Sequence, residues 1–219
     1  MDQRKRSISK VQEIVQALEV DIVIGRLYPR EHLVEEQLAR RFDTTRHVIR
    51  QAIVELDAAG LVVREANKGA SVCEYSPDEV NQLYTVREIL ERQAALMIQF
   101  PIDQPAFNTL EKIRAAHAAA VESSDMMTIV ATNKTFHQQL FSLCGNQFLS
   151  EIINDMAKRS NLVRFTTSTS KDYLRQVVVE HSQILDALAA GDQQRLALLC
   201  VEHLQPSRRM YLERKGPLT

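Results

Sequence analysis

The chain has 219 residues, of which 45% are hydrophobic and 25% charged, and its net charge is -1. This composition excludes a disordered chain, and the near-neutral charge means that no global basic field attracts nucleic acid. Three cysteines, Cys73, Cys144 and Cys200, lack CxxC spacing, which indicates buried thiols in a reducing compartment. We find no signal peptide and no stretch near the roughly 20 apolar residues of a membrane span. We therefore expect a cytoplasmic protein without a membrane partner.

Three helices are predicted in the first third of the chain. Apolar residues recur at three- and four-residue steps, and Gly25 and Gly60 follow two of the runs as helix-ending residues. Thr45 is a suitable N-cap for the third helix. The predicted helices are 8–25, 34–41 and 45–59.

A β-hairpin is predicted directly after these helices. Short apolar strands over 61–64 and 70–73 flank a turn at 65–69 that contains Gly69. Two short helices joined by a tight turn and followed by a hairpin are typical of a winged helix-turn-helix. We assign residues 1–75 to such a domain.

From Ser76 to the end, the pattern is helical. Ser76 and Pro77 form an N-cap followed by a proline at the first helical position, and we place the domain boundary here. The predicted helices are 77–99, 103–123, 125–144, 147–167, 171–190 and 192–214. Long helices with short links predict an antiparallel bundle over 76–219, so the protein is mainly α-helical.

Polar residues of the first domain gather where a winged helix-turn-helix meets DNA. Arg46 and Arg50 lie one turn apart on the third helix, so they share a face near its N-terminus. Arginine offers two parallel donors to guanine, or charge to phosphate, and a solvated polar face is the alternative interpretation. The predicted DNA contacts are Arg40, Arg41, Thr45, Arg46, His47, Arg50, Lys68 and Gly69.

The stretch from Val20 to Val72 resembles the DNA-binding domain of the GntR superfamily. The resemblance rests on GRLYPREHLVEEQLARRF, TTRHVIRQAIVEL, AAGLVV and NKGASV. Thr45 replaces the family's usual Ser, and His47–Val48–Ile49 replaces the usual T-P-V. Arg46 and Arg50 stand at the family's DNA-contacting arginines, so the resemblance implies binding to double-stranded operator DNA.

Three histidines of the bundle form a candidate metal site. Asn133 and His137 are four residues apart and project from one helix face, while His181 and His203 lie on two later helices. Imidazole is the commonest side-chain ligand of divalent transition metals, and bundles build such sites between facing helices. Hydrogen-bonded core histidines are the alternative. The other three histidines, including His117, have no such company.

Residues 78–214 resemble the FCD domain of the FadR-type branch. The matching motifs are VREILE at 86–91, NKTFH at 133–137, EH at 180–181 and EHL at 202–204. Metal-binding members carry Asp-x-x-x-His and two later histidines. The resemblance thus implies metal ligation by His137, His181 and His203. Three neutral nitrogen donors favour zinc or nickel as the metal. Asn133 stands at the aspartate position and brings no charge.

The resemblance also implies a small carboxylate effector and a homodimer. Arg87 stands at the family's first-helix arginine, and Arg164 is a second candidate effector anchor, because a guanidinium matches a carboxylate. A salt bridge to a bundle glutamate such as Glu91 is the alternative for both arginines.

The predicted function is a DNA-binding transcription regulator, a repressor, controlled by an effector in the bundle. Two alternatives use the histidines instead: a metal-dependent hydrolase-like protein or a metal sensor. A hydrolase is disfavoured because no HExxH, nucleophile elbow or P-loop occurs. A purely architectural DNA-binding protein would leave the bundle without a role.

Overall fold

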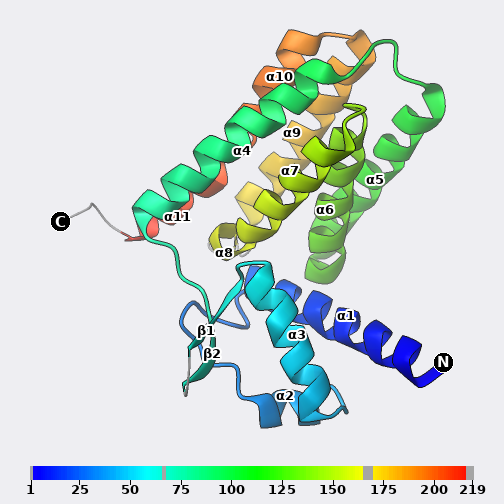
Figure 1. The fold of residues 1–219 in the computed structure, drawn as a ribbon. Helices are drawn as coiled ribbons and strands as arrows, with labels where there is room; N and C mark the ends of the chain where they lie inside the picture. Colours follow the sequence, from blue (N-terminus) through cyan, green and yellow to red (C-terminus); the bar gives the residue numbers. More distant parts are fainter. Residues whose placement is uncertain (1, 66–67, 165–169, 216–219) are drawn as a thin grey trace. The chain divides into compact units, whose positions relative to one another are not determined.

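The computed structural model describes residues 2–65, 68–164 and 170–215 (Figure 1). Contacts divide the chain into two units. The first comprises the chain up to Tyr75 together with residues 158–164, and the second comprises the rest. The predicted wing turn at 66–67 and the predicted helix end at 165–167 lie outside the described residues.

The first unit is a winged helix-turn-helix, as predicted. Its helices and strands are α1 (Asp2–Val23), α2 (Glu35–Arg41), α3 (Arg46–Ala58), β1 (Val62–Glu65) and β2 (Gly69–Val72). β1 and β2 pair antiparallel with Val62 opposite Val72 and Glu65 opposite Gly69. Gly69 has φ +87°, a backbone conformation that favours glycine and lets the chain turn back into β2.

Local chemistry sets the bounds of α3, which carries most of the predicted DNA contacts. The Thr45 hydroxyl accepts a hydrogen bond from the Val48 amide and caps the first turn. Gly60, at φ +71°, follows the helix end. Ile49, Ala52, Ile53 and Leu56 are buried, so the opposite face of α3 is left to solvent.

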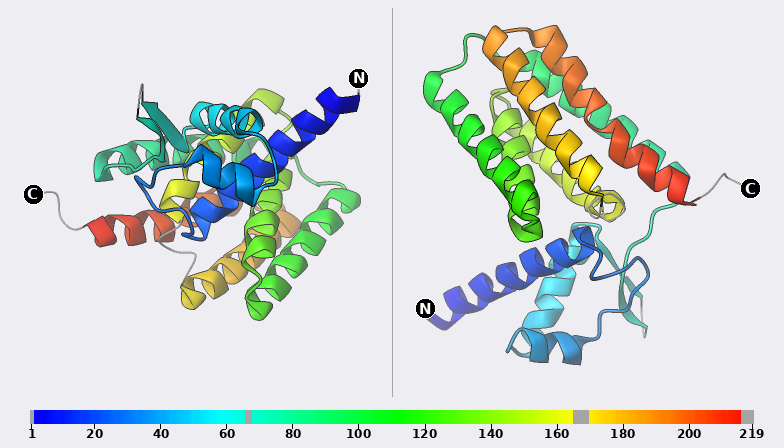
Figure 2. Two further views of the ribbon diagram at one scale, coloured as in Figure 1. Left: turned by 90° about the horizontal axis from the view of Figure 1, so that it is seen from below. Right: turned by 180° about the vertical axis from the view of Figure 1, so that it is seen from behind.

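The second unit is a helical bundle. Its helices are α4 (Pro77–Met97), α5 (Gln104–Ser123), α6 (Met126–Ser142), most of α7 (Gln147–Arg159), α9 (Lys171–Ala190), α10 (Gln193–Glu202) and α11 (Gln205–Lys215). α4 packs along α10 and α11, and α5 packs against α6 and α9; Figure 2 shows α4 beside α11 from behind. A capping box of Ser76 and Glu79 starts α4. None of the described helices has the length and apolar character to cross a membrane.

Two of the predicted helices are wrong, because the structure divides each of them into two helices. The predicted helix 147–167 is divided, since α7 ends at Arg159 and a short α8 (Asn161–Arg164) follows buried Ser160. The predicted helix 192–214 is also divided, because α10 ends at Glu202 and α11 begins at Gln205. Pro206 has no amide proton to donate, which suits the first turn of a new helix and not a helix interior.

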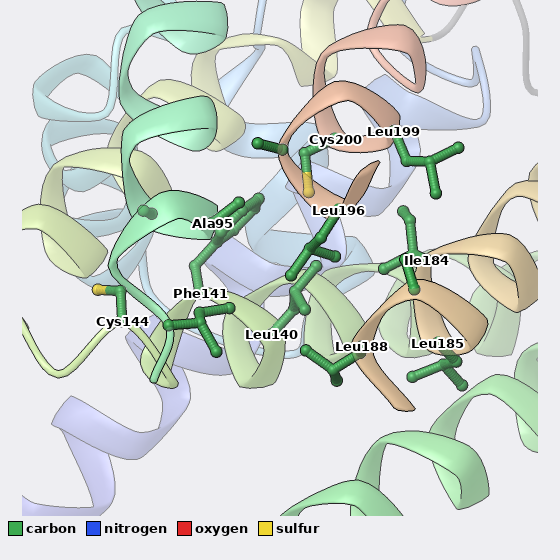
Figure 3. Packing of buried hydrophobic residues seen from close by; sticks show 14 of the residues in the cluster. Ala95, Leu140, Phe141, Cys144, Ile184, Leu185, Leu188, Leu196, Leu199 and Cys200 are labelled. Atoms are coloured by element: carbon green, nitrogen blue, oxygen red, sulfur yellow. The ribbon is translucent and has the colours of Figure 1, made fainter. Parts of the chain in front are cut away.

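The core of the bundle joins side chains from helices that are far apart in the sequence. Figure 3 shows Leu140 and Phe141 of α6 with Ile184 and Leu188 of α9 and Leu196 of α10. All are at most 2% exposed. α6, α9 and α10 are the helices that lead to the three candidate histidines, so this packing fixes the spacing of the site.

Candidate metal centre and DNA-reading surface

The three predicted metal-ligating histidines lie together. His137 comes from α6, His181 from α9, and His203 follows the last residue of α10. One ring nitrogen of each lies within 4.8 Å of those of the other two, and all three side chains are buried. Chain segments 22 to 66 residues apart thus bring three imidazoles to one point.

The donor geometry fits a transition metal. His137 Nε2 and His203 Nε2 are 3.1 Å apart. Two nitrogens that bind zinc at about 2.0–2.1 Å lie about 3.4 Å apart at the tetrahedral angle, so small side-chain shifts suffice to bind an ion. His203 Nδ1 lies 2.6 Å from Glu180 Oε2. A proton on Nδ1, donated to Glu180, leaves the Nε2 lone pair for the metal.

Glu180 belongs to the motif EH at 180–181, but no role is predicted for it from the sequence. It is the carboxylate that orients His203, a common arrangement around metal-bound histidines. Aromatic rings surround the cluster: Phe136 stacks on His181 at 4.0 Å between ring centres, and Phe141 stacks on His137 at 6.2 Å. The site is therefore held in a largely apolar shell.

A fourth histidine, His117 of α5, was missed. It is 1% exposed, and its ring centre lies 5.1 Å from that of His181. The expectation that it has no ligand-like company is wrong. The pKa of His117 is lowered to about 4: burial is the main cause, a hydrogen bond with the Ile129 backbone opposes it, and electrostatic repulsion from His203 adds to the lowering. His117 occupies the same buried face of α5 as Leu110 and Ala120, and this periodicity is the signal that reveals it.

Asn133 lies one turn before His137 on α6 and is partly exposed. Its amide oxygen is neutral, so any bond to a metal would lack the charge of a carboxylate. Its place as a fourth ligand stays a prediction.

The proposed effector anchors have different surroundings. Arg87 of α4 is buried and forms an ion pair with Glu91, with Nε 2.9 Å from Glu91 Oε1. Burial is the largest single influence and acts to lower the pKa of Arg87. The charge of Glu91, its hydrogen bond, and the charges of Tyr84 and Tyr173 together outweigh burial, so the pKa is raised. Arg164 ends α8, which groups with the first unit. The salt bridge weighed as the alternative for Arg87 is thus present, and both anchor roles stay predictions.

The predicted DNA contacts of α2 and α3 form an exposed surface, which we call the recognition surface: Arg40, Thr45, Arg46, His47 and Arg50. Two arginines of this surface are paired with acids of α2. Arg46 Nη2 lies 2.8 Å from Glu36 Oε2, and Arg50 Nε lies 2.8 and 2.9 Å from the two carboxylate oxygens of Glu35. Glu36 also contacts Arg40. The hydrogen bond to Glu35 and its charge raise the pKa of Arg50.

The remaining predicted DNA contacts have other neighbours. Arg41 pairs with Asp21, which is 1% exposed, and its guanidinium lies 4.8 Å from the ring centre of Phe42. Arg41 therefore also stabilises the interior of the first unit. Lys68 and Gly69 are exposed at the wing, where Lys68 pairs with Glu65 at 2.7 Å.

Family models match both units. Residues 10–72 match the model described as bacterial regulatory proteins, gntR family, and residues 82–206 match the FCD domain. The chain belongs to the GntR family and carries an FCD domain. It is a DNA-binding transcription regulator and not an enzyme, so the hydrolase alternative is set aside.

Relatives agree with this assignment. The chain is 23% identical to the HTH-type transcriptional repressor RspR of Escherichia coli K12, over 89% of this chain and 85% of that one. It is 23% identical to the Nta operon transcriptional regulator of Aminobacter aminovorans, over 81% and 82%. Among solved structures, E. coli McbR/YncC is similar in fold, with a TM-score of 0.81, 19% identity, and coverage of 94% and 99%.

Proposed function

We propose that this protein is a cytoplasmic, homodimeric repressor that releases operator DNA when a small carboxylate binds beside a divalent metal in the FCD domain. The observation that carries the proposal is the buried cluster of His137, His181 and His203 in a chain of a DNA-binding family. The repressor assignment is supported by the name of the relative RspR. An effector shifts DNA affinity only by its differential affinity for two states of the bundle.

The metal is zinc or nickel, because neutral nitrogen donors suit these ions better than calcium or magnesium. The full chain, stripped with a chelator and dialysed against either ion at neutral pH, should retain one ion per chain by elemental analysis. His181→Ala should abolish retention by removing one of three imidazoles. His32→Ala, which changes an exposed histidine of the first unit, is the matched control.

The uncharged Asn133 allows a second test of the same site. Asn133→Asp should tighten metal binding, because it adds a negative ligand one turn before His137. Failure of the wild-type chain to retain zinc, nickel or manganese would refute the metal, and the histidines would then be polar groups lining an effector pocket. Release of DNA by zinc alone, without an acid, would instead make the protein a metal sensor.

Arg46 and Arg50 are the proposed base contacts. In a gel shift with DNA selected by the protein from a random library, Arg46→Ala or Arg50→Ala should weaken binding by roughly 1–3 kcal/mol. Arg175→Ala, at an exposed arginine of α9, is the control and should leave binding unchanged. Wild-type affinity in both single variants and in the double variant would contradict the proposed recognition surface.

The carboxylate effector is proposed to contact Arg87 through donors that Glu91 does not occupy, with Arg164 as a second anchor. Arg87→Lys keeps the charge opposite Glu91 but loses the paired donors of the guanidinium. It should weaken acetate binding to the zinc-loaded chain about tenfold by calorimetry. Arg164→Lys tests the second anchor in the same way, and unchanged affinity in both variants would refute the anchors.

Dimerisation is proposed to use the bundle. Val86 and Ile89 are 42% and 63% exposed and lie three residues apart on α4, so they form an apolar surface. Ile89→Glu should convert a dimer of about twice 24.9 kDa into a monomer in sedimentation. Val54→Glu, at an exposed valine of α3, is the control. The full chain is used because residues 158–164 group with the first unit, so cutting the chain at residue 75 would divide that unit.

A further inference from the structure

His117 is a buried histidine of the bundle that has no role so far, because it is not one of the three candidate metal ligands. It lies on α5, is 1% exposed, and has its ring 5.1 Å from that of His181 at an interplanar angle of 49°. It is not one of the three described residues whose ligand atoms lie within 4.8 Å of one another. His117 thus borders the metal centre without belonging to the coordinating set.

The hydrogen bonds of Thr132 determine which nitrogen of His117 carries the proton. The Thr132 hydroxyl donates to the Thr128 carbonyl at 2.6 Å, with the Ile129 carbonyl at 3.2 Å. A hydroxyl has one proton, so Thr132 Oγ1 must act as the acceptor in its 2.9 Å contact with His117 Nδ1. His117 Nδ1 therefore carries the proton and donates it to Thr132.

The other nitrogen of His117 is then a bare acceptor. Nε2 is buried and has no hydrogen-bond partner among the described residues. A buried acceptor without a donor is costly, by an amount comparable to a lost hydrogen bond. His137, His181 and His203 each present one lone pair to a metal when they bind one, and none of them donates to His117 Nε2 in the structure. A group that the metal holds can supply the missing donor.

We propose that His117 Nε2 accepts a hydrogen bond from a hydroxyl group on the carboxylate effector, so that the site selects 2-hydroxy acids over plain carboxylates. The inference rests on the proposed metal and carboxylate function. A 2-hydroxy acid chelates one ion through a carboxylate oxygen and the hydroxyl oxygen. A metal held by the three histidines would polarise that hydroxyl and so strengthen it as a donor to a neutral imidazole. His117 acts here as a specificity-determining residue and not as a metal ligand.

The test compares glycolate with acetate, which differ by one hydroxyl group, on the zinc-loaded full chain. Calorimetry gives the affinity ratio for the two acids, and elemental analysis gives the zinc content of each variant. His117→Leu should keep zinc and acetate binding but lower the preference for glycolate about tenfold, the loss of about one buried hydrogen bond. His117→Gln, whose amide oxygen can replace the Nε2 acceptor, should retain the preference.

A second variant tests the proton assignment without touching the imidazole. Thr132→Val removes the hydroxyl oxygen that accepts the Nδ1 proton and leaves only the hydrogen bond with the Ile129 backbone to hold that proton. The tautomer with the proton on Nε2 is then more populated, so the glycolate preference should fall in this variant too. An unchanged preference in Thr132→Val would overturn the role of Thr132 in setting the tautomer.

The measurements distinguish failure of the proposed metal function from failure of the inference about His117. If the wild-type chain retains no zinc, the proposed metal function fails, and this inference fails with it. If zinc and acetate bind but His117→Leu has the wild-type glycolate-to-acetate ratio, only this inference is overturned. That second result is also the one expected if His117 accepts its hydrogen bond from a metal-bound water.

Discussion

Arginine–glutamate pairs occur in both units, and the Arg87–Glu91 pair of the bundle differs sharply in burial from the two pairs of the recognition surface. In the bundle, the side chains of Arg87 and Glu91 are 3% and 2% exposed. On the recognition surface, those of Arg50 and Glu35 are 65% and 33% exposed, and those of Arg46 and Glu36 are 58% and 50% exposed. The same two residue types thus meet in an apolar interior and in water.

The difference teaches what each pair can do. Loss of one partner from a buried pair leaves an uncompensated charge, which destabilises the fold strongly. An exposed pair contributes roughly 0–1 kcal/mol, because water screens it. Arg46 can therefore leave Glu36 for DNA at little cost, whereas the charge of Arg87 stays opposite Glu91. Charge is exchangeable on the recognition surface and fixed in the Arg87–Glu91 pair.

The largest expected effect is on the buried pair. Glu91→Gln removes the charge opposite Arg87 and should lower the free energy of unfolding of the bundle by about 3–5 kcal/mol in urea. The double variant Arg87→Met with Glu91→Leu removes both charges and should recover most of the loss. Equal, small effects of Glu91→Gln and of Glu35→Gln on unfolding would contradict the contrast between the two units.

The next effect concerns the pH dependence of bundle stability. His117 has a folded pKa of about 4 against 6.5 for the free side chain, so between these values the unfolded chain binds more protons. The contribution of neutral His117 to the free energy of unfolding is therefore complete above pH 6.5 and is lost as the pH falls toward 4. The total loss is on the order of 3 kcal/mol. His117→Leu should flatten the stability of the metal-free chain over this window. An identical pH slope in the wild type and the variant would rule the effect out.

Sequence patterns predicted the DNA-reading unit better than the sensing site, for a physical reason. The bounds of α3, 46–58 against a predicted 45–59, follow from the Thr45 cap and the backbone of Gly60. These are interactions between near neighbours in the chain. The periodicity of apolar residues likewise identified the helices of the bundle, except where Ser160 separates α7 from α8 and where His203 and Leu204 separate α10 from α11.

The metal centre depends on contacts between distant helices. The family motifs named His137, His181 and His203, but no local signal shows that Glu180 reaches His203 or that Thr132 reaches His117. His117 itself was detectable, because it falls on the buried face of α5, where a polar residue needs a partner. The contact of His117 with His181 was not detectable, because the packing of α5 against α9 alone determines it.

A smaller effect is expected at Glu35. Both of its carboxylate oxygens hold Arg50 Nε, which fixes the direction of that side chain on the recognition surface. Glu35→Gln removes a negative charge, so simple electrostatics predicts tighter binding to any DNA. We expect instead that operator affinity falls about tenfold while affinity for unrelated DNA rises, because a freed Arg50 is no longer oriented. Gel shifts with both DNAs separate the two outcomes, and tighter binding to both would remove the positioning role.

The smallest effect is expected at Glu36, and its sign is opposite. Glu36 divides its oxygens between Arg40 and Arg46, and its side chain is 50% exposed, so it holds neither arginine firmly. Glu36→Gln frees two cations at the recognition surface and removes one charge that repels phosphate. Operator affinity should rise by less than about tenfold, with a steeper dependence on salt concentration. Salt titrations of the gel shift measure both quantities. Weaker operator binding in Glu36→Gln would show that this exposed pair, like Glu35 with Arg50, orients the arginines it contacts.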